Sequence, residues 1–397
     1  MFENIIGQEP VVGRLSTEAR AAILPPTLLF HGPDYAGKSS TALELARVLT
    51  CTGGDPSVPW ACGCRGCLQQ RHLLHPETLL LGGRYFSREI AVAATALKRD
   101  KRAPLRYLLE RSVRKLTRRF DPVLWEGEEG RIRKVEPLLA ELEELLSPYL
   151  PDGELPDDRR YAKGLDSVTA VCEKIAAVQP LDAVPVHVVR RLSHWSHLVA
   201  SGPAKVAIIE NIDRLHESAR NALLKTLEEP PHGVYFVLTT QRRGAVMQTI
   251  LSRARAYGFT TRDAAQSKAV IERIFRDAPM DSPSIRDYFI SIDGRGLRPL
   301  AERFLESCLT GDDIELSLLD EIARTISSLG AGEGFRYFLE ELGDLMRSVL
   351  RSGGGVSPRV LGVWRSELRR AAVRVEAYNV AASRALEGLY YTMRRTA

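Results

Sequence analysis

The sequence has no apolar run approaching the roughly 20 residues that a membrane-spanning helix needs, so we expect no transmembrane segment. It also lacks a strong excess of charge of one sign, because 55 Lys and Arg residues stand against 50 Asp and Glu, for a net charge of +5. That excess is too small to decide whether the chain binds nucleic acid. The 397 residues, 44% of them apolar, are typical of a soluble chain of two or three domains.

Cysteine is also sparse, but four of the six cysteines fall within one seventeen-residue stretch. These four are Cys51, Cys62, Cys64 and Cys67. Four thiolates this close together suit a tetrahedral structural zinc site. A disulfide is disfavoured, because no signal peptide precedes the first predicted strand and we therefore expect the reducing cytoplasm. The isolated Cys172 and Cys308 are predicted to be buried apolar residues rather than ligands.

A phosphate-binding loop is complete at Gly32–Ser39, which matches G-x-x-x-x-G-K-[S/T]. Thr27–His31 before it reads as a buried strand, and Ser39–Leu49 after it reads as a helix. Backbone N–H groups and the helix dipole would cradle phosphates, Lys38 would reach the β and γ positions, and Ser39 would face Mg²⁺. The alternative is a Gly-rich turn that opens an ordinary helix. The predicted nucleotide-binding residues of the loop are Gly32, Gly37, Lys38, Ser39 and Ser40.

One acidic residue expected of a nucleotide hydrolase is missing. Lys205–Ile209 reads as a second buried strand, and the next two positions, where paired Asp and Glu are expected, hold Glu210 and Asn211. Glu210 could still approach Mg²⁺, but the Asn211 amide cannot accept a proton from water. We therefore expect ATP hydrolysis to be weak or absent. Asp213 could substitute, but the Arg214-Leu215-His216 run after it looks like a helix entry, which favours a capping role for Asp213.

Three segments carry a resemblance to a known family. Phe2–Pro10, the phosphate loop and Asn221–Pro231 together resemble the bacterial clamp-loader AAA+ subunits of DNA polymerase III, most closely delta-prime and next gamma/tau. The resemblance covers residues 1–80 and 183–310 well and the last hundred residues loosely. It implies a P-loop AAA+ fold, a place in a hetero-oligomeric ring, and a site for ATP with Mg²⁺.

The resemblance also implies zinc, because clamp-loader ATPase subunits carry a four-cysteine zinc module right after the phosphate-loop helix. Two residues usually separate the successive later ligands of that module. Here only Gly63 separates Cys62 from Cys64, which departs from the family pattern, although C-x-C pairs can share a metal.

Two further contacts to nucleotide follow from the resemblance. Val234–Thr240 reads as a third buried strand, and its end resembles the position where AAA+ proteins place a residue that senses the γ-phosphate. Thr240 or Thr239 would do so here, although paired threonines also suit a strand end. Asp293–Leu300 resembles the segment that opens the lid's sensor helix, with Arg298 either contacting nucleotide or standing as a surface arginine at a helix entry.

Thr249–Ala254 is similar to the family's T-I-L-S-R-C, in which the arginine projects into the ATP site of a neighbouring subunit. Arg253 is predicted to be this trans-acting finger, with Arg255 the nearest alternative. A guanidinium suits the task because its planar fork neutralises charge that develops on the γ-phosphoryl group. The other interpretation is a solvated surface arginine.

Alternating strand and helix patterns to about residue 262 predict a parallel sheet with helices on both faces, whereas the rest reads at helical period. With the family pattern, the predicted parts are an AAA+ domain, 1–262, with its zinc module, 51–67; a helical lid, 263–312; and a helical collar, 313–397. Gly353–Gly355 is predicted to be a loop, and Glu376–Arg395 an amphipathic helix that the resemblance assigns to ring assembly.

Residues 84–182 match no motif and behave as an insertion with polarised charge. Residues 84–119 hold twelve basic residues against three acidic ones, and residues 121–158 hold twelve acidic residues against three basic ones. The basic half could track a phosphate backbone. We favour instead a helical hairpin in which the two halves pair with each other.

Three functions fit the sequence. The first is a delta-prime-like subunit that hydrolyses no ATP, donates Arg253, and works with gamma/tau and delta-like subunits to load the sliding clamp onto primed DNA. The second is a gamma/tau-like ATPase motor of the same complex, in which Glu210 alone suffices. The third is an unrelated P-loop nucleotide-binding or kinase module with a zinc site, which the arginine motif and Asn221–Pro231 disfavour.

Overall fold

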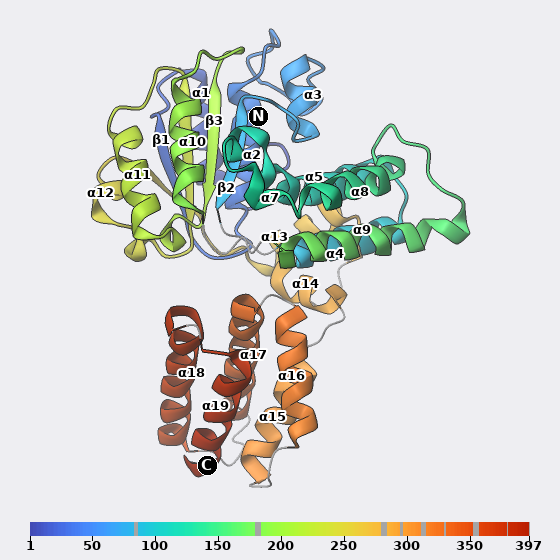
Figure 1. Cartoon of the computed structure of the whole chain (residues 1–397), viewed down its shortest axis with the longest axis vertical. Helices are drawn as coiled ribbons and strands as arrows, with labels where there is room; N and C mark the ends of the chain where they lie inside the picture. The colour runs from blue at the N-terminus through green and yellow to red at the C-terminus, as the bar shows by residue number, and fades with distance from the viewer. Residues whose placement is uncertain are drawn as a thin grey trace. The chain divides into compact units, whose positions relative to one another are not determined.

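A computed structural model describes residues 1–82, 86–178, 184–278, 284–293, 297–310, 315–328, 331–351, 357–378 and 380–396. The chain divides into two compact units, residues 1–292 and 293–397 (Figure 1). No helix within the described ranges is long and apolar enough to cross a membrane. The loop predicted at Gly353–Gly355 lies outside the described residues.

The first unit is built on a five-stranded sheet of order β2-β3-β4-β1-β5 in which every pair is parallel. The strands are β1 (Thr27–His31), β2 (Thr78–Gly82), β3 (Lys205–Glu210), β4 (Val234–Thr240) and β5 (Arg255–Gly258). The predicted strands correspond to β1, β3 and β4, whose continuous apolar runs are typical of strands buried on both faces. Because the strands are parallel, the carboxyl ends of these three meet at one edge of the sheet.

Helices cover both faces of this sheet, which confirms the predicted α/β P-loop AAA+ class (Figure 1). Neighbouring residues of a strand enter different cores: Leu29 and Leu81 belong to one cluster, and Phe30 and Leu80 to the other. The helices of this unit outside the insertion are α1 (Glu9–Arg20), α2 (Lys38–Leu49), α3 (Arg65–Arg71), α10 (Val186–His197), α11 (Glu217–Glu228), α12 (Gln248–Leu251), α13 (Ala264–Val270) and α14 (Ile285–Asp293).

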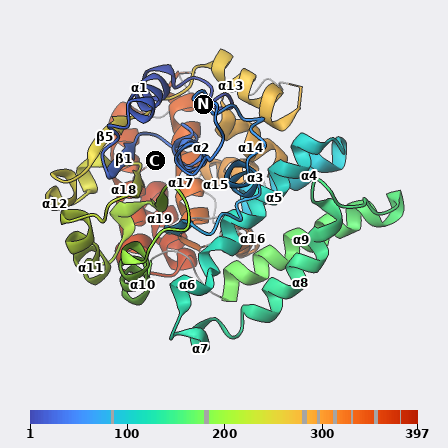
Figure 2. The same ribbon diagram turned by 90° about the horizontal axis from the view of Figure 1, so that it is seen from above.

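The insertion folds as a helical layer whose core is continuous with one face of the sheet. Its helices are α4 (Ser87–Arg99), α5 (Ala103–Thr117), α6 (Pro122–Trp125), α7 (Glu129–Ile132), α8 (Glu136–Leu146) and α9 (Asp158–Val178). The four longer helices lie side by side, with α4 against α5 and α9, and α8 against α9 (Figure 2). The prediction of a single hairpin is therefore too simple.

The two charged halves of the insertion do pair with each other, but only in part. Arg114 of α5 lies 2.9 Å from Glu143 of α8, and Lys101 lies 2.5 Å from Asp158 at the start of α9. Other basic side chains bind backbone carbonyl groups instead. Arg111 donates to the carbonyls of Gln70 and Arg71 at 2.9 and 2.8 Å, and Arg106 donates to carbonyls between residues 148 and 153. These arginines serve the fold, which argues against a phosphate-tracking surface built from them.

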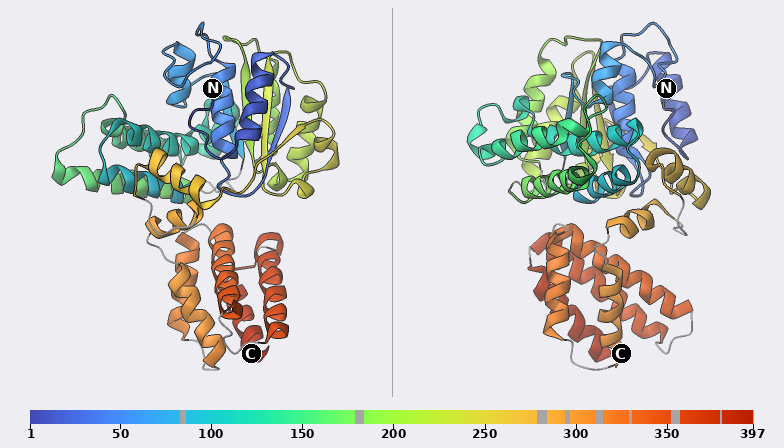
Figure 3. Two further views of the ribbon diagram at one scale, coloured as in Figure 1. Left: turned by 180° about the vertical axis from the view of Figure 1, so that it is seen from behind. Right: turned by 90° about the vertical axis from the view of Figure 1, so that its right-hand side faces the viewer.

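The second unit is helical and consists of α15 (Leu297–Thr310), α16 (Leu316–Ser328), α17 (Ala331–Arg351), α18 (Pro358–Tyr378) and α19 (Ala382–Thr396), which lie side by side (Figure 3). The predicted lid, 263–312, is divided between the units, because α15 packs against α16, α17 and α19. The terminal amphipathic helix is α19, so it begins at Ala382 rather than at the predicted Glu376. Its buried Met393 carbonyl accepts a hydrogen bond from Trp364 of α18 at 3.1 Å.

We expect the buried His75 to make the stability of the first unit depend on pH. Burial lowers its pKa below the usual 6.5, the charge of Arg118 lowers it further, and Glu77 opposes them. The Glu77 N–H also donates to Nδ1 of His75 at 3.2 Å, which requires that nitrogen to be unprotonated. Below pH 6.5 the unfolded chain therefore binds more protons than the folded one, and the free energy of unfolding should fall as the pH drops.

We expect the urea midpoint of unfolding to decrease as the pH is lowered from about 7.5 to 5.5. His75→Gln should reduce the dependence of this midpoint on pH. His232→Gln, at an exposed histidine, is the matched control. A slope unchanged by His75→Gln would show that other groups carry the dependence.

Candidate functional site

The phosphate loop connects β1 to α2 at the carboxyl edge of the sheet. Two of its glycines are required by the backbone: φ is +146° at Gly32 and +93° at Gly37. A Cβ on Gly32 would lie 2.3 Å from the Phe259 carbonyl oxygen, and one on Gly37 would lie 2.6 Å from the guanidinium of Arg262. The loop conformation therefore depends on both glycines, as the motif predicts.

Lys38 begins α2 and folds back over the loop. Its Nζ donates to the carbonyl oxygens of Gly32 and Pro33 at 2.7 and 2.6 Å, and the residue is 8% exposed. Ser39 is half-buried, whereas Ser40 is exposed on the first turn of α2. The ammonium thus lies inside the loop, where it could exchange carbonyl contacts for phosphate oxygens.

Glu210 ends β3 and is almost fully buried. Its Oε1 accepts a hydrogen bond from the Ser39 hydroxyl, and its Oε2 forms an ion pair with the guanidinium of Arg119. The two charged side chains are 2% and 3% exposed. Arg119 comes from the insertion, and the sequence analysis did not identify it as a site residue. The only feature of the sequence that pointed to Arg119 was its position at the end of the basic run.

Asn211 follows Glu210 with φ 52° and ψ 54°, in the left-handed region that asparagine tolerates better than most residues. Its N–H donates to the Thr239 hydroxyl at 3.2 Å. The predicted capping role of Asp213 is wrong, because α11 begins after His216 and Asp213 lies in a separate turn. The Asp213 carboxylate instead accepts from the Thr240 hydroxyl at 2.7 Å.

The segment after β4 adds cationic groups that the sequence analysis missed. Arg242 lies 3.6 Å from Asp213, and Gln241 donates to Asp34 of the phosphate loop. Burial lowers the pKa of His31, and the charges of Arg243 and Lys38 lower it further. The loop is therefore bordered by positive charge from a second segment, which suits a phosphate ligand.

Arg253 follows the short helix α12 and is 31% exposed. Its Nη2 lies 2.6 Å from Glu228 at the end of α11, and its Nη1 donates to the Thr249 carbonyl at 2.7 Å. The alternative finger, Arg255, lies in β5 and pairs with Glu18 at 3.2 Å. The Arg253 guanidinium is thus on the surface of the first unit, held by a partly exposed carboxylate.

Arg298 lies in α15, in the second unit. It is half exposed and pairs with Glu302 of the same helix at 3.3 Å and with Glu341 of α17 at 3.5 Å. Its contact with nucleotide stays a prediction.

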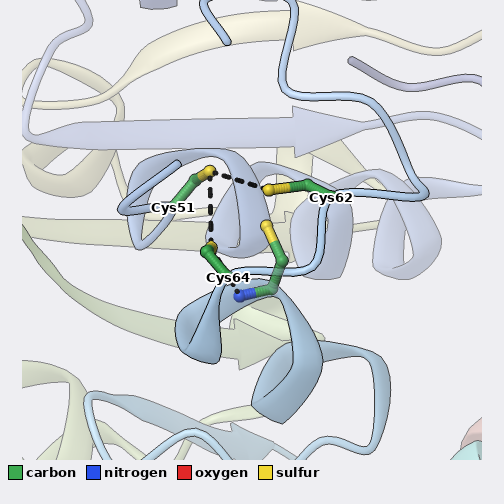
Figure 4. A group of neighbouring side chains, drawn as sticks. Cys51, Cys62 and Cys64 are labelled. Carbon is green, nitrogen blue, oxygen red and sulfur yellow. Dashed lines mark hydrogen bonds between the residues drawn. The ribbon is translucent and has the colours of Figure 1, made fainter. Parts of the chain in front are cut away.

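The four clustered cysteines are brought together after α2, and Figure 4 shows three of them, Cys51, Cys62 and Cys64. All four sulfur atoms lie within 4.8 Å of one another, and Cys51 Sγ lies 3.8 Å from both Cys62 Sγ and Cys64 Sγ. A tetrahedral ion with metal–sulfur bonds of about 2.3 Å would separate its sulfurs by roughly 3.8 Å. The donor set could therefore hold a metal ion, and the single residue between Cys62 and Cys64 does not prevent it.

Arg47 of α2 connects this helix to the cysteine module through hydrogen bonds. Its buried guanidinium pairs with Glu44 at 2.6 Å, donates to the Val58 and Pro59 carbonyls at 2.8 and 3.0 Å, and contacts Cys67 Sγ at 3.2 Å. The same helix begins at the phosphate loop, so the module is anchored to the element that positions Lys38.

Comparisons with known proteins agree with the resemblance inferred from the motifs. A family model described as DNA polymerase III, delta subunit, matches residues 171–263. The tau subunit of Escherichia coli DNA polymerase III is 27% identical over 195 residues, which are 44% of this chain and 27% of tau. The E. coli delta-prime subunit is 37% identical over 92 residues, or 23% of this chain and 26% of that subunit. The Haemophilus influenzae delta-prime subunit is 41% identical over 56 residues, or 14% and 17% of the two chains.

The chain thus aligns with no more than about a quarter of the length of these relatives. Among solved structures, a DNA polymerase III gamma-subunit-related protein of Thermotoga maritima aligns over 96% of this chain and 98% of its own, at 14% identity and a TM-score of 0.38. The family model and the curated relatives confirm that the chain resembles the clamp-loader subunits of bacterial DNA polymerase III, with delta-prime and gamma/tau subunits both among its relatives.

Proposed function

We propose that this protein is a delta-prime-like subunit of a DNA polymerase III clamp loader that supports ATP-dependent loading of the sliding clamp but hydrolyses no ATP itself. The observation that carries the proposal is the state of the acidic site, where Asn211 replaces one acid and Arg119 pairs with the other, Glu210. Its partners would be gamma/tau and delta-like subunits in a hetero-oligomeric ring, with the clamp and primed DNA bound by the whole complex.

The lack of hydrolysis follows from the chemistry of the residues at the edge of the sheet. A general base must accept a proton from the attacking water, and the Asn211 amide cannot do so. Glu210 is bonded to Ser39 and Arg119, and Asp213 accepts from Thr240 and faces Arg242. Neither carboxylate is placed as a base for water.

The chain would contribute Arg253 to a neighbouring subunit's ATP. The side chain lies on the surface, and its partner Glu228 is 48% exposed. Such a pair is worth at most about 1 kcal/mol, so a stronger phosphate contact could replace it. The cysteine module would bind one structural zinc ion through Cys51, Cys62, Cys64 and Cys67.

The isolated chain is expected to show no ATP turnover above the level of a Lys38→Ala variant, which removes the ammonium of the phosphate loop. The measurement is steady-state phosphate release by the purified chain. Turnover that Lys38→Ala abolishes would favour the alternative function, a hydrolysing gamma/tau-like motor. That alternative is supported by the complete phosphate loop and by the alignment with tau over 195 residues.

A further inference from the structure

The acidic site does not fit the magnesium ion that a phosphate loop ordinarily uses. In such sites the Ser/Thr hydroxyl binds the metal directly, and the acid at the end of the neighbouring strand holds the metal's water shell. Here the Ser39 hydroxyl donates to Glu210, and the other carboxylate oxygen of Glu210 pairs with Arg119. Both groups that would face the metal are already bonded within the protein.

We propose that Arg119 takes the place of the magnesium ion, so that this chain binds nucleotide without a divalent metal. The inference deepens the proposed function and rests on it, with the added premise that the phosphate loop holds a nucleotide. Without Arg119, the charges of Lys38 and Glu210 would cancel, and a metal-free polyphosphate would meet no net attraction from them. The guanidinium neutralises Glu210 and leaves the charge of Lys38 for the phosphates.

Arg119 is held in place by the fold. The indole of Trp125 donates to the Arg119 carbonyl at 2.8 Å, and the guanidinium lies over the ring of Phe86 at 5.4 Å. The preceding Arg118 pairs with Asp121 at 2.7 Å and donates to the carbonyl of Thr78, the first residue of β2. Because these contacts fix the backbone on both sides of Arg119, the cation is built into the site.

The close approach of β2 to Glu210 requires a glycine at the end of the strand. Gly82 ends β2 with φ +110°, and a Cβ there would lie 2.1 Å from the Glu210 carbonyl oxygen. Only glycine lets the end of β2 lie against Glu210 in this way. Gly82 therefore lies against the backbone of Glu210, while Arg119 from the insertion and Ser39 contact its carboxylate.

The test is a titration of the purified full chain with ATP, with Mg²⁺ and with EDTA, followed by calorimetry. The two dissociation constants should agree within about twofold, or roughly 0.4 kcal/mol. For Arg119→Met, the affinity for ATP in EDTA should fall at least about tenfold. The affinity of this variant should then depend on whether Mg²⁺ is present. In Arg119→Met/Glu210→Gln, which leaves no buried charge unpaired, the dependence on Mg²⁺ should disappear again.

Arg114→Met is the matched control, because Arg114 is another buried insertion arginine with an ion pair but its partners are Glu110 and Glu143. It should keep the wild-type insensitivity to Mg²⁺. Thermal unfolding without nucleotide gives a second readout: Mg²⁺ should raise the Tm of Arg119→Met and leave that of the wild type unchanged.

Wild-type affinity that falls tenfold or more in EDTA would overturn the inference and leave the proposed function intact. If the wild type binds no ATP under either condition, both the inference and its premise fail, whereas the role of Arg253 in the complex is tested separately.

Discussion

Replacing Arg253 by alanine should lower the DNA-stimulated ATPase of the assembled clamp loader by about 10³-fold at the one interface that this subunit completes. The reason is that the guanidinium would neutralise charge on the γ-phosphoryl group of the neighbour's ATP, a role that a methyl group cannot replace. Assembly should be unaffected, because the side chain is held by a partly exposed carboxylate rather than by core packing. The measurements are single-turnover hydrolysis and size-exclusion chromatography of the reconstituted complex.

Two controls sharpen this experiment. Glu228→Ala removes the partner that holds Arg253 in the isolated chain and should leave the rate unchanged or slightly higher. Arg255→Ala removes the neighbouring arginine, which pairs with Glu18, and should have little effect. A full rate in Arg253→Ala with a large loss in Arg255→Ala would assign the finger to Arg255. Full rates in both would exclude this role.

Removing the proposed zinc ion is the change with the next largest expected effect. Cys64→Ser should reduce the bound zinc from about one ion per chain to well below one, because structural zinc sites need all four thiolates. A structural zinc ion contributes on the order of 10 kcal/mol to folding, and each kcal/mol shifts the Tm of a unit as large as residues 1–292 by roughly 1–2 °C, so we expect Tm to fall by about 10 °C or more. The measurements are elemental analysis and calorimetric unfolding.

Cys308→Ala is the control for that experiment. Cys308 is buried in the second unit, outside the cluster, so its loss should cost packing energy and leave zinc content unchanged. Because α2 links the cysteine module to the phosphate loop through Arg47, loss of zinc should also weaken ATP binding. A Cys64→Ser chain with full zinc and wild-type Tm would contradict the assignment.

The parts of the structure that could be predicted from the sequence are those with a local pattern. The apolar run at Thr27–His31 is a strand because a parallel strand is buried on both faces, and the loop after it has a defined motif. The four cysteines lie close in sequence, so their proximity in space needed little inference. The capping role predicted for Asp213 was wrong because a short run such as Arg214-Leu215-His216 can follow a helix cap or follow a separate turn, and local spacing does not distinguish the two.

The pairing of Arg119 with Glu210 had no such signal. The two residues lie 91 positions apart in the sequence. Arg119 also belongs to a run of basic residues that look alike in the sequence but have different partners in the fold. Arg114 pairs with Glu143 across the insertion, whereas Arg111 donates to carbonyl groups in the last turn of α3. Charge composition predicts that such a segment needs anionic or carbonyl partners, but only the tertiary fold determines which arginine reaches Glu210.

We have proposed that this chain serves a clamp loader without hydrolysing ATP. The most direct test is to measure loading of a labelled sliding clamp onto primed DNA by gamma/tau and delta-like subunits, with and without this chain and with ATP turnover followed in parallel. We predict that loading requires the chain, although the chain alone releases no phosphate. Equal loading in its absence, or turnover by the chain alone at the rate of the complex, would contradict the claim.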